Sequence, residues 1–325
     1  MATKLNRILV VLLVCQVGIL IAMRLSCTDH DKQIAKKIFA DLQADQITKI
    51  DIEDNEKKKI VLSKTDQGWV LSSSGDYPLR KDKAADFLAK LPALTATQPV
   101  SSKVAHHRAL EVADADFQRR VSLTKKDGSS IQFYLGSSPG IKNVHLRLDK
   151  EDHVYLVNGL SSWDLGMTPS SWVDTEYFKV DREKLISLTL QNSNGEIQLT
   201  KGKEGKWEIS GLSSGSNLKD SEIDSFINSV TSVSLREPVG KKIEAGFGLE
   251  KPVAVLTLIT QEPTKENEPQ ELKQTTHMLS IGTKVDDDYY AKSSSSDFVV
   301  RLASWTADSL LKKKISDFEE KKDGK

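Results

Sequence analysis

Residues 47–70 read ITKIDIEDNEKKKIVLSKTDQGWV, and residues 185–209 read LISLTLQNSNGEIQLTKGKEGKWEI. In both stretches apolar and polar residues alternate, which is typical of β-strands that bury one face. Turn-forming residues separate three short strands in each stretch, and Asn194-Gly195 is a good signal for a two-residue hairpin. The matching positions are Ile50 with Leu188, Ile52 with Leu190, Ile60 with Ile197, Leu62 with Leu199, and Trp69 with Trp207. The two stretches therefore predict two copies of one antiparallel β-unit.

After each set of three predicted strands, the apolar residues recur at the spacing of an α-helix. Apolar residues recur there at the spacings i, i+3, i+4 and i+7, which places them on one face of an α-helix of about three turns. These residues are Ala84, Phe87, Leu88 and Leu91 in the first copy, and Ile223, Phe226, Ile227 and Val230 in the second. We expect Asp82 and Asp220 to cap the two helices and Pro92 to end the first one.

The two copies divide the chain into modules. A chain of 325 residues suits about two domains, and we place the modules at residues 44–180 and 181–318, with a charged tail at 319–325. The second copy carries a longer polar insertion at residues 261–274, which we expect to be a solvated loop. Because strand hairpins alternate with one principal helix, we predict an α+β fold of two tandem, internally duplicated antiparallel-sheet modules with packed helices.

The N-terminus indicates a membrane anchor. Residues 8–23 carry no charge, and basic residues flank them on both sides. As a helix they would span roughly 24 Å of the ~30 Å hydrocarbon core, and Leu5 and Leu25 make up most of the difference. We therefore predict one transmembrane helix within residues 1–27. Since Lys4 and Arg7 precede the helix, the positive-inside rule keeps the N-terminus in the cytoplasm and exports the rest of the chain. The expected location is the cell inner membrane, single-pass, with the bulk of the chain periplasmic.

Two alternatives remain for this segment. It has the length of a cleaved signal peptide, and Cys27 is in a position to be lipidated. Arg24 stands where the cleavage site of a signal peptide would need a small residue. A lipoprotein signal usually carries leucine at the same place. We therefore favour the uncleaved anchor over both.

Composition and motifs offer little chemistry. With 46 basic and 46 acidic residues the net charge is zero, which gives no support for nucleic-acid binding. Two cysteines cannot build a disulfide scaffold or a four-thiolate zinc site. The strings at 136–140 and 211–215 match G-x-S-x-G but lack the strand and helix of a nucleophile elbow, so we interpret both as turns.

The remaining candidates for metal or acid chemistry are also weak. The six histidines show no metal-ligand spacing, although His145 and His153 are expected on neighbouring strands. Asp286, Asp287 and Asp288 lack the glycine and final glutamate of a calcium loop, and we interpret them as a solvated hairpin turn. We thus predict no catalytic, cofactor-binding or metal-binding residues and no enzymatic activity. A hydrolase with an unrecognised pair of acids is the less favoured alternative.

Several motifs resemble a known family. They are GFGLEKPVAVLTLI at residues 246–259, LSIGTK at 279–284 and SSWVDTEYFKV at 170–180, together with the N-terminal anchor and the strand–strand–Trp-strand–helix block. This layout is similar to domain-of-unknown-function family 4340. The first copy departs from the family pattern at residues 106–123. The resemblance implies an envelope protein associated with ABC-type export or gliding systems, and it implies no catalytic residues.

These observations predict a non-enzymatic, membrane-anchored extracytoplasmic protein. We expect it to act as an accessory, scaffold or protein-interaction component of an envelope system, with an ABC-type transport complex among the expected partners. The expected partners are the bilayer, through the N-terminal helix, and a membrane or envelope protein, with no nucleic acid and no cofactor. The alternative is a glycan- or peptidoglycan-contacting module that uses exposed aromatics such as Trp163, Trp172 or Trp305. We expect Trp69 and Trp207 instead to cover one end of a core.

Overall fold

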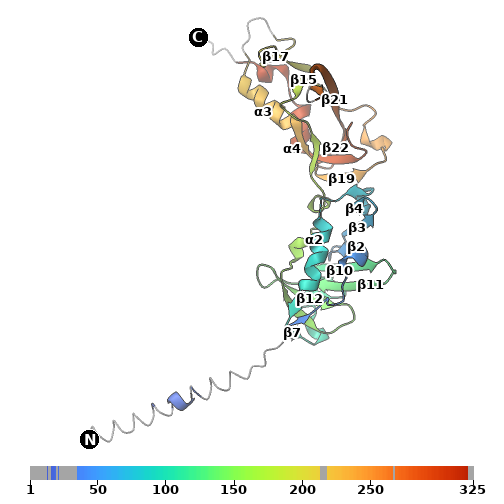
Figure 1. Cartoon of the computed structure of the whole chain (residues 1–325), viewed down its shortest axis with the longest axis vertical. Helices are drawn as coiled ribbons and strands as arrows, with labels where there is room; N and C mark the ends of the chain where they lie inside the picture. The colour runs from blue at the N-terminus through green and yellow to red at the C-terminus, as the bar shows by residue number, and fades with distance from the viewer. Residues whose placement is uncertain are drawn as a thin grey trace, which may run out of the picture.

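The computed structural model describes residues 35–212, 218–265 and 268–320, together with Leu13, residues 16–19 and Ile21. The body is elongated, with two halves placed end to end (Figure 1). Most of the predicted anchor, residues 8–23, lies outside the described residues. Among the described residues, no helix has the length and apolar character needed to cross a membrane.

A nine-stranded antiparallel sheet forms the first half. Its central strand β2 (Ile47–Glu53) pairs with β3 on one side and with β10 on the other. The order across the sheet is β5 (Tyr77–Pro78), β4 (Gly68–Leu71), β3 (Lys59–Thr65), β2, β10 (Arg119–Lys125), β11 (Ser130–Leu135), β12 (Asn143–Leu148), β13 (Val154–Asn158) and β7 (Pro99–Ser101). The three strands expected at the start of the first copy are confirmed as β2, β3 and β4.

An eight-stranded antiparallel sheet forms the second half and repeats this order. It runs β17 (Trp207–Ile209), β16 (Gly195–Lys201), β15 (Leu185–Asn192), β20 (Ala254–Lys265), β21 (Glu268–Val285), β22 (Asp288–Ser293), β23 (Val299–Ala303) and β19 (Glu237–Gly240). Strand for strand, this matches the path from β4 to β7 in the first half. The fold is thus α+β-like, mostly sheet with few helices, as the alternating pattern predicts. The boundaries at 180 and 318 stay predictions.

Short strand pairs flank the sheets. β1 (Lys36–Lys37) pairs with β6 (Thr95–Ala96), and β14 (Glu176–Lys179) pairs in the same way with β18 (Ser232–Ser234). β14 lies inside the predicted first module but packs with the second half. A third pair, β8 (Val112–Ala113) with β9 (Asp116–Phe117), lies where the sequence departs from the family pattern.

Three α-helices supply the remaining core contacts in the described body. α2 (Lys83–Lys90) buries Ala84, Phe87 and Leu88, and α3 (Asp220–Thr231) buries Ile223, Phe226, Ile227 and Val230. These residues confirm the predicted apolar stripes. α4 (Ser304–Leu311) follows β23, and eight short 3-10 turns complete the elements: η1 (Ala44–Gln46), η2 (Ser72–Ser74), η3 (Leu91–Ala93), η4 (Val104–His106), η5 (Ser162–Asp164), η6 (Pro169–Ser171), η7 (Ala245–Phe247) and η8 (Ile315–Phe318).

The helix starts differ from the predicted caps. Asp82 occupies the N-cap position of α2, but it has a left-handed backbone and its side chain makes no capping hydrogen bond. Asp220 is the first residue of α3, because the N-cap is Lys219. Both capping predictions are therefore wrong in their chemistry. Pro92 does end the first helix, since α2 stops at Lys90 and the chain continues as η3.

The polar insertion at 261–274 is also not a loop. β20 and β21 remain paired from Ala254 with Ile281 out to Lys265 with Glu268, so the insertion extends this hairpin as a two-stranded ribbon. Its charged, proline-containing sequence gives no alternation because a ribbon outside the sheet has no core to face.

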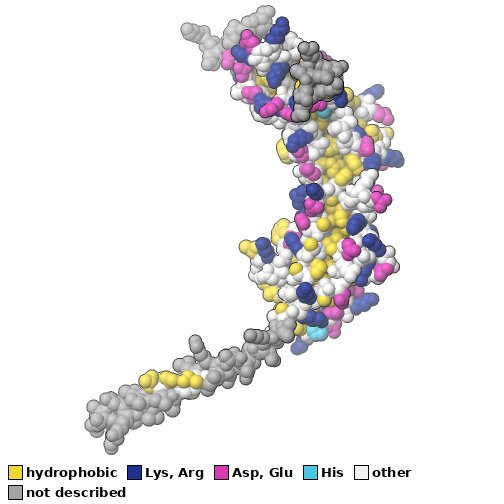
Figure 2. Space-filling model, in the orientation of Figure 1, with side chains coloured by type: hydrophobic (Ala, Val, Ile, Leu, Met, Phe, Trp, Pro, Cys, Tyr) yellow, Lys and Arg dark blue, Asp and Glu magenta, His cyan; other side chains and the backbone are white. Residues whose placement is uncertain are grey.

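The turn η2, between β4 and β5 of the first sheet, meets β19 of the second (Figure 1). Backbones come so close there that a Cβ added at Gly75 would lie 2.9 Å from the Cα of Gly240. The ring of Tyr77 lies 4.7 Å from that of Phe298, which also receives the ammonium of Lys241 at 5.0 Å. In Figure 2 apolar side chains run through the middle of the visible face, with basic and acidic side chains interspersed around them. The two halves therefore meet through packed contacts rather than through a linker alone.

Candidate binding groove along helix α2

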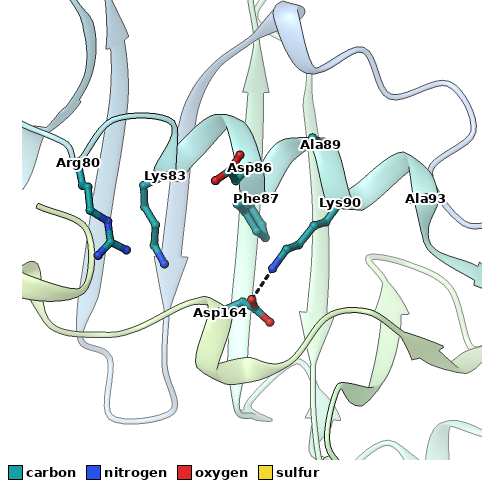
Figure 3. A pocket seen from close by; sticks show the side chains of 8 residues that line it. All are labelled: Arg80, Lys83, Asp86, Phe87, Ala89, Lys90, Ala93 and Asp164. Atoms are coloured by element: carbon teal, nitrogen blue, oxygen red, sulfur yellow. Dashed lines mark hydrogen bonds and ion pairs between the residues drawn. The ribbon is translucent and has the colours of Figure 1, made fainter.

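A groove of about 540 Å³ runs beside α2 in the first half (Figure 3). The helix forms one wall, and the segment that carries Asp164 forms the other. The lining residues are Arg80, Lys83, Asp86, Phe87, Ala89, Lys90, Ala93 and Asp164. A smaller cavity of about 270 Å³ continues past the start of the helix toward Trp69 and shares Arg80 and Lys83 with the first. The two cavities make one elongated surface groove, which we call the α2 groove.

The amphipathic pattern of α2 explains its wall. Because Ala84, Phe87 and Leu88 face the core, the polar residues of the helix turn outward. In Figure 3 the side chains of Arg80, Lys83 and Lys90 extend toward the Asp164 segment, whereas the carboxylate of Asp86 points away from it. The helix, together with Arg80 just before it, therefore presents a row of cations to the groove.

Trp172 fixes the opposite wall. Its side chain is fully buried, and its indole N–H donates to the carbonyl of Gly166 at 2.8 Å. The backbone N–H of Arg80 donates to the carbonyl of Trp172 at 2.9 Å, which ties this wall to the start of the helix. The ammonium of Lys83 lies 5.4 Å from the Trp172 ring centroid, a cation–π contact. Both walls are thus held by the core rather than by mobile side chains.

One ion pair crosses the groove. Lys90 Nζ lies 2.6 Å from Asp164 Oδ1, and the other carboxylate oxygen of Asp164 accepts from the N–H and hydroxyl of Ser161. Burial raises the pKa of Asp164, but the hydrogen bonds from Lys90 and Ser161 outweigh it and hold that pKa below its usual value. Among the described residues, Arg80 and Lys83 have no carboxylate within ion-pair distance. These two charges are available to an anionic ligand.

The first G-x-S-x-G string is a turn, as predicted. Gly136 follows β11 and Ser137 precedes β12, so the serine lies between antiparallel strands and not at a strand-to-helix elbow. Its hydroxyl donates to the carbonyl of Leu110 and lies 3.0 Å from Nδ1 of His145. Part of the second string, residues 213–215, lies outside the described residues.

His145 predicts a pH effect on stability. Burial lowers its pKa, against an opposing hydrogen bond with the backbone of Ser137. Between this lowered pKa and the unfolded value of about 6.5, the unfolded chain binds more protons, so stability should fall as pH drops through that window. Urea unfolding at several pH values should show this slope, and His145→Gln should reduce it. An unchanged slope in the variant would assign the effect to another group.

The described residues contain no group of three or more His, Cys, Asp or Glu side chains suited to a metal ion. His145 pairs across the ladder with Leu156, not with His153. Asp286 and Asp287 form the predicted hairpin turn between β21 and β22, but Asp288 is not solvated. It is 5% exposed and forms ion pairs with Arg236 and Arg301. Two arginines therefore face this cluster.

The tryptophans separate into three groups. Trp69 and Trp207 are partly buried and pack against the core, as predicted. Trp163 and Trp305 are 87% and 77% exposed, as a contact surface requires. Trp172 is fully buried, so its expected role as an exposed aromatic is wrong.

Sequence reasoning named no site residues and therefore missed the α2 groove. The apolar stripe predicts the helix but carries no information about a partner for its outer face. A signal was present in Arg80, Lys81 and Lys83, because cations cluster where the helix dipole favours acidic residues. Asp164 had no such signal, since it lies 74 positions beyond Lys90.

Comparison with known proteins gives one match. The family model described as a domain of unknown function (DUF4340) matches residues 69–246, more than half of the chain, and this range includes α2 and both walls of the groove. No curated protein and no solved structure matches the chain. The chain belongs to the DUF4340 family.

Proposed function

We propose that this protein is a membrane-anchored, extracytoplasmic scaffold of non-enzymatic type that docks a protein partner of the cell envelope in the α2 groove. The partner is a membrane or envelope protein, with a component of an ABC-type transport complex as the leading candidate. The uncharged segment at residues 8–23 supplies the anchor in this proposal. A short tether raises the effective concentration of the docking surface beside a membrane partner.

The α2 groove is the observation that carries the docking role. It presents two cations without carboxylate partners among the described residues, on walls held by buried side chains. The described body begins at the β7 end of the first half, and the second half lies beyond it (Figure 1). The groove thus belongs to the half that comes first after the predicted anchor in the sequence.

Site-specific crosslinking in intact cells tests this function. A photo-crosslinking residue at Ala89, which lines the groove, should give a defined adduct with an envelope protein in the membrane fraction. The matched control is Asn228, the position of α3 that corresponds to Ala89 when the two apolar stripes are aligned. A chain recovered in the cytosol, or equal adducts from both positions, would contradict the proposal. The mass of the mature N-terminus distinguishes an intact anchor from cleavage or lipidation at Cys27.

Contact with glycan or peptidoglycan is a second candidate, supported by the exposure of Trp163 and Trp305. Flat aromatic faces open to solvent suit sugar stacking. Titration with soluble cell-wall fragments should then change tryptophan fluorescence, and Trp163→Ala with Trp305→Ala should abolish the change. No response at millimolar fragment would contradict this candidate.

A further inference from the structure

Two cations at the start of α2 have acidic counterparts in the second half, whereas Arg80 falls opposite Lys219. When the buried stripe of α2 is aligned with that of α3, Lys81 falls opposite Asp220, Lys83 opposite Glu222, and Lys90 opposite Ser229. α3 nevertheless forms a longer helix and buries the equivalent apolar residues. The fold therefore does not need lysine at positions 81 and 83, because the same architecture forms with acidic residues at the two equivalent positions of α3.

These cations also lie where they weaken the helix. Lys83 is the first residue of α2, and Arg80 and Lys81 precede it by only a few positions. The N-terminal end of a helix carries partial positive charge, so basic residues there are unfavourable and acidic ones favourable. α3 has the favourable arrangement, because the acidic residues Asp220 and Glu222 lie in its first turn. Cations placed against the helix dipole, with no carboxylate partner among the described residues, are characteristic of binding sites.

The dimensions of the groove suit an extended chain. Lys83 and Lys90 lie seven residues apart on the helix, which is about 10 Å along its axis. An extended peptide covers that length with roughly three residues. The side chains of Ala89 and Ala93 are single methyl groups, so a peptide backbone can approach the groove closely at these two positions. The residues that line the larger cavity include no exposed aromatic ring, and Trp163 is not among them, which favours a peptide over a sugar there.

We infer that the α2 groove binds an acidic peptide segment, with its carboxylates paired to Arg80 and Lys83 and its backbone lying over Ala89 and Ala93. This inference rests on the proposed docking function and names the chemistry of the partner. Lys90 already pairs with Asp164, so Arg80 and Lys83 supply the ligand's charge-assisted hydrogen bonds.

Fluorescence anisotropy on the full chain in detergent tests the inference. The probe is a short fluorescein-labelled peptide with glutamate at every third position, and its matched control carries glutamine instead. We expect the glutamate peptide to bind and the glutamine peptide not to bind, with affinity falling as salt is raised. Lys83→Glu, which copies Glu222 of the second half, should weaken binding at least about tenfold while leaving Tm unchanged or raised. Lys219→Glu, at the position of α3 equivalent to Arg80, should leave affinity unchanged.

Three results would overturn the inference: equal binding of both peptides, full binding by Lys83→Glu, or tighter binding of a carboxylated oligosaccharide than of the peptide at the same groove. A drop in Tm for Lys83→Glu would show a structural role for the lysine and would also count against it. The crosslinking experiment separates the two proposals. An Ala89 adduct that persists in Lys83→Glu would retain the docking function and reject the acidic chemistry, whereas peptide binding without any cellular adduct would retain the groove chemistry and reject the function.

Discussion

Replacing Trp172 with alanine should lower the free energy of unfolding of the first half by about 3–5 kcal/mol, the range typical for loss of a large buried aromatic side chain. The ring is fully buried in the core, and its indole N–H is the partner of the Gly166 carbonyl. Removal therefore opens a cavity and leaves a polar group unpaired. Since a domain is stable by only about 5–15 kcal/mol, this is a large fraction of the total.

The chain contains a matched control for this change. Trp163 is the same residue type in the same segment, but it is 87% exposed, so Trp163→Ala should change stability by no more than about 0.5 kcal/mol. Urea unfolding followed by far-ultraviolet circular dichroism compares the two variants. The acidic peptide should also lose affinity for Trp172→Ala, because Trp172 holds one wall of the groove and contacts Lys83. Similar stability losses in the two variants would contradict the assigned burial.

Local strand and helix patterns could be predicted because each depends on neighbouring residues. Alternation at Ile50 and Ile52 reports a strand with one buried face, and both residues are fully buried. The order of strands is not local, since β2 pairs with β10, whose residues lie far along the chain. The ribbon of β20 and β21 was missed because backbone pairing, not a buried face, defines it.

The site was less predictable than the fold for a related reason. A groove needs two walls, and its ion pair joins Lys90 to Asp164 across 74 positions of sequence. The residues around Asp164 in the sequence give no indication that Lys90 is its partner. The same limit applies to Asp288, which looked like part of a solvated turn. Its burial depends on Arg236 and Arg301, which come from other strands or their flanks.

Arg301 holds an acidic network in the second half. Its guanidinium lies 2.9 Å from Glu237, 3.1 Å from Asp286 and 3.1 Å from Asp288. Burial alone would lower the pKa of Arg301, but the carboxylates of Glu237, Asp288 and Asp286 raise it. The residue also links strands, since it pairs with Glu237 of β19 and Tyr290 of β22. The network therefore ties β19, the strand at the junction, to the rest of its sheet.

Arg301→Met should consequently destabilise the second half by about 3–5 kcal/mol, because it leaves the nearly buried carboxylate of Asp288 without its main counter-charge. The double variant Arg301→Met with Asp288→Leu should recover much of this loss, since an apolar pair of similar volume avoids the desolvation of both charges. Asp288 Oδ1 and Arg301 Nε have no hydrogen-bond partner in the described part of the chain, which makes the apolar replacement favourable.

Urea unfolding of both single variants and of the double variant forms a complete cycle. The exposed pair of Lys58 with Glu56 provides the control, and Lys58→Ala should have no measurable effect. Additive losses in the cycle would show that Arg301 and Asp288 are not coupled, and the role assigned to this network would then fail.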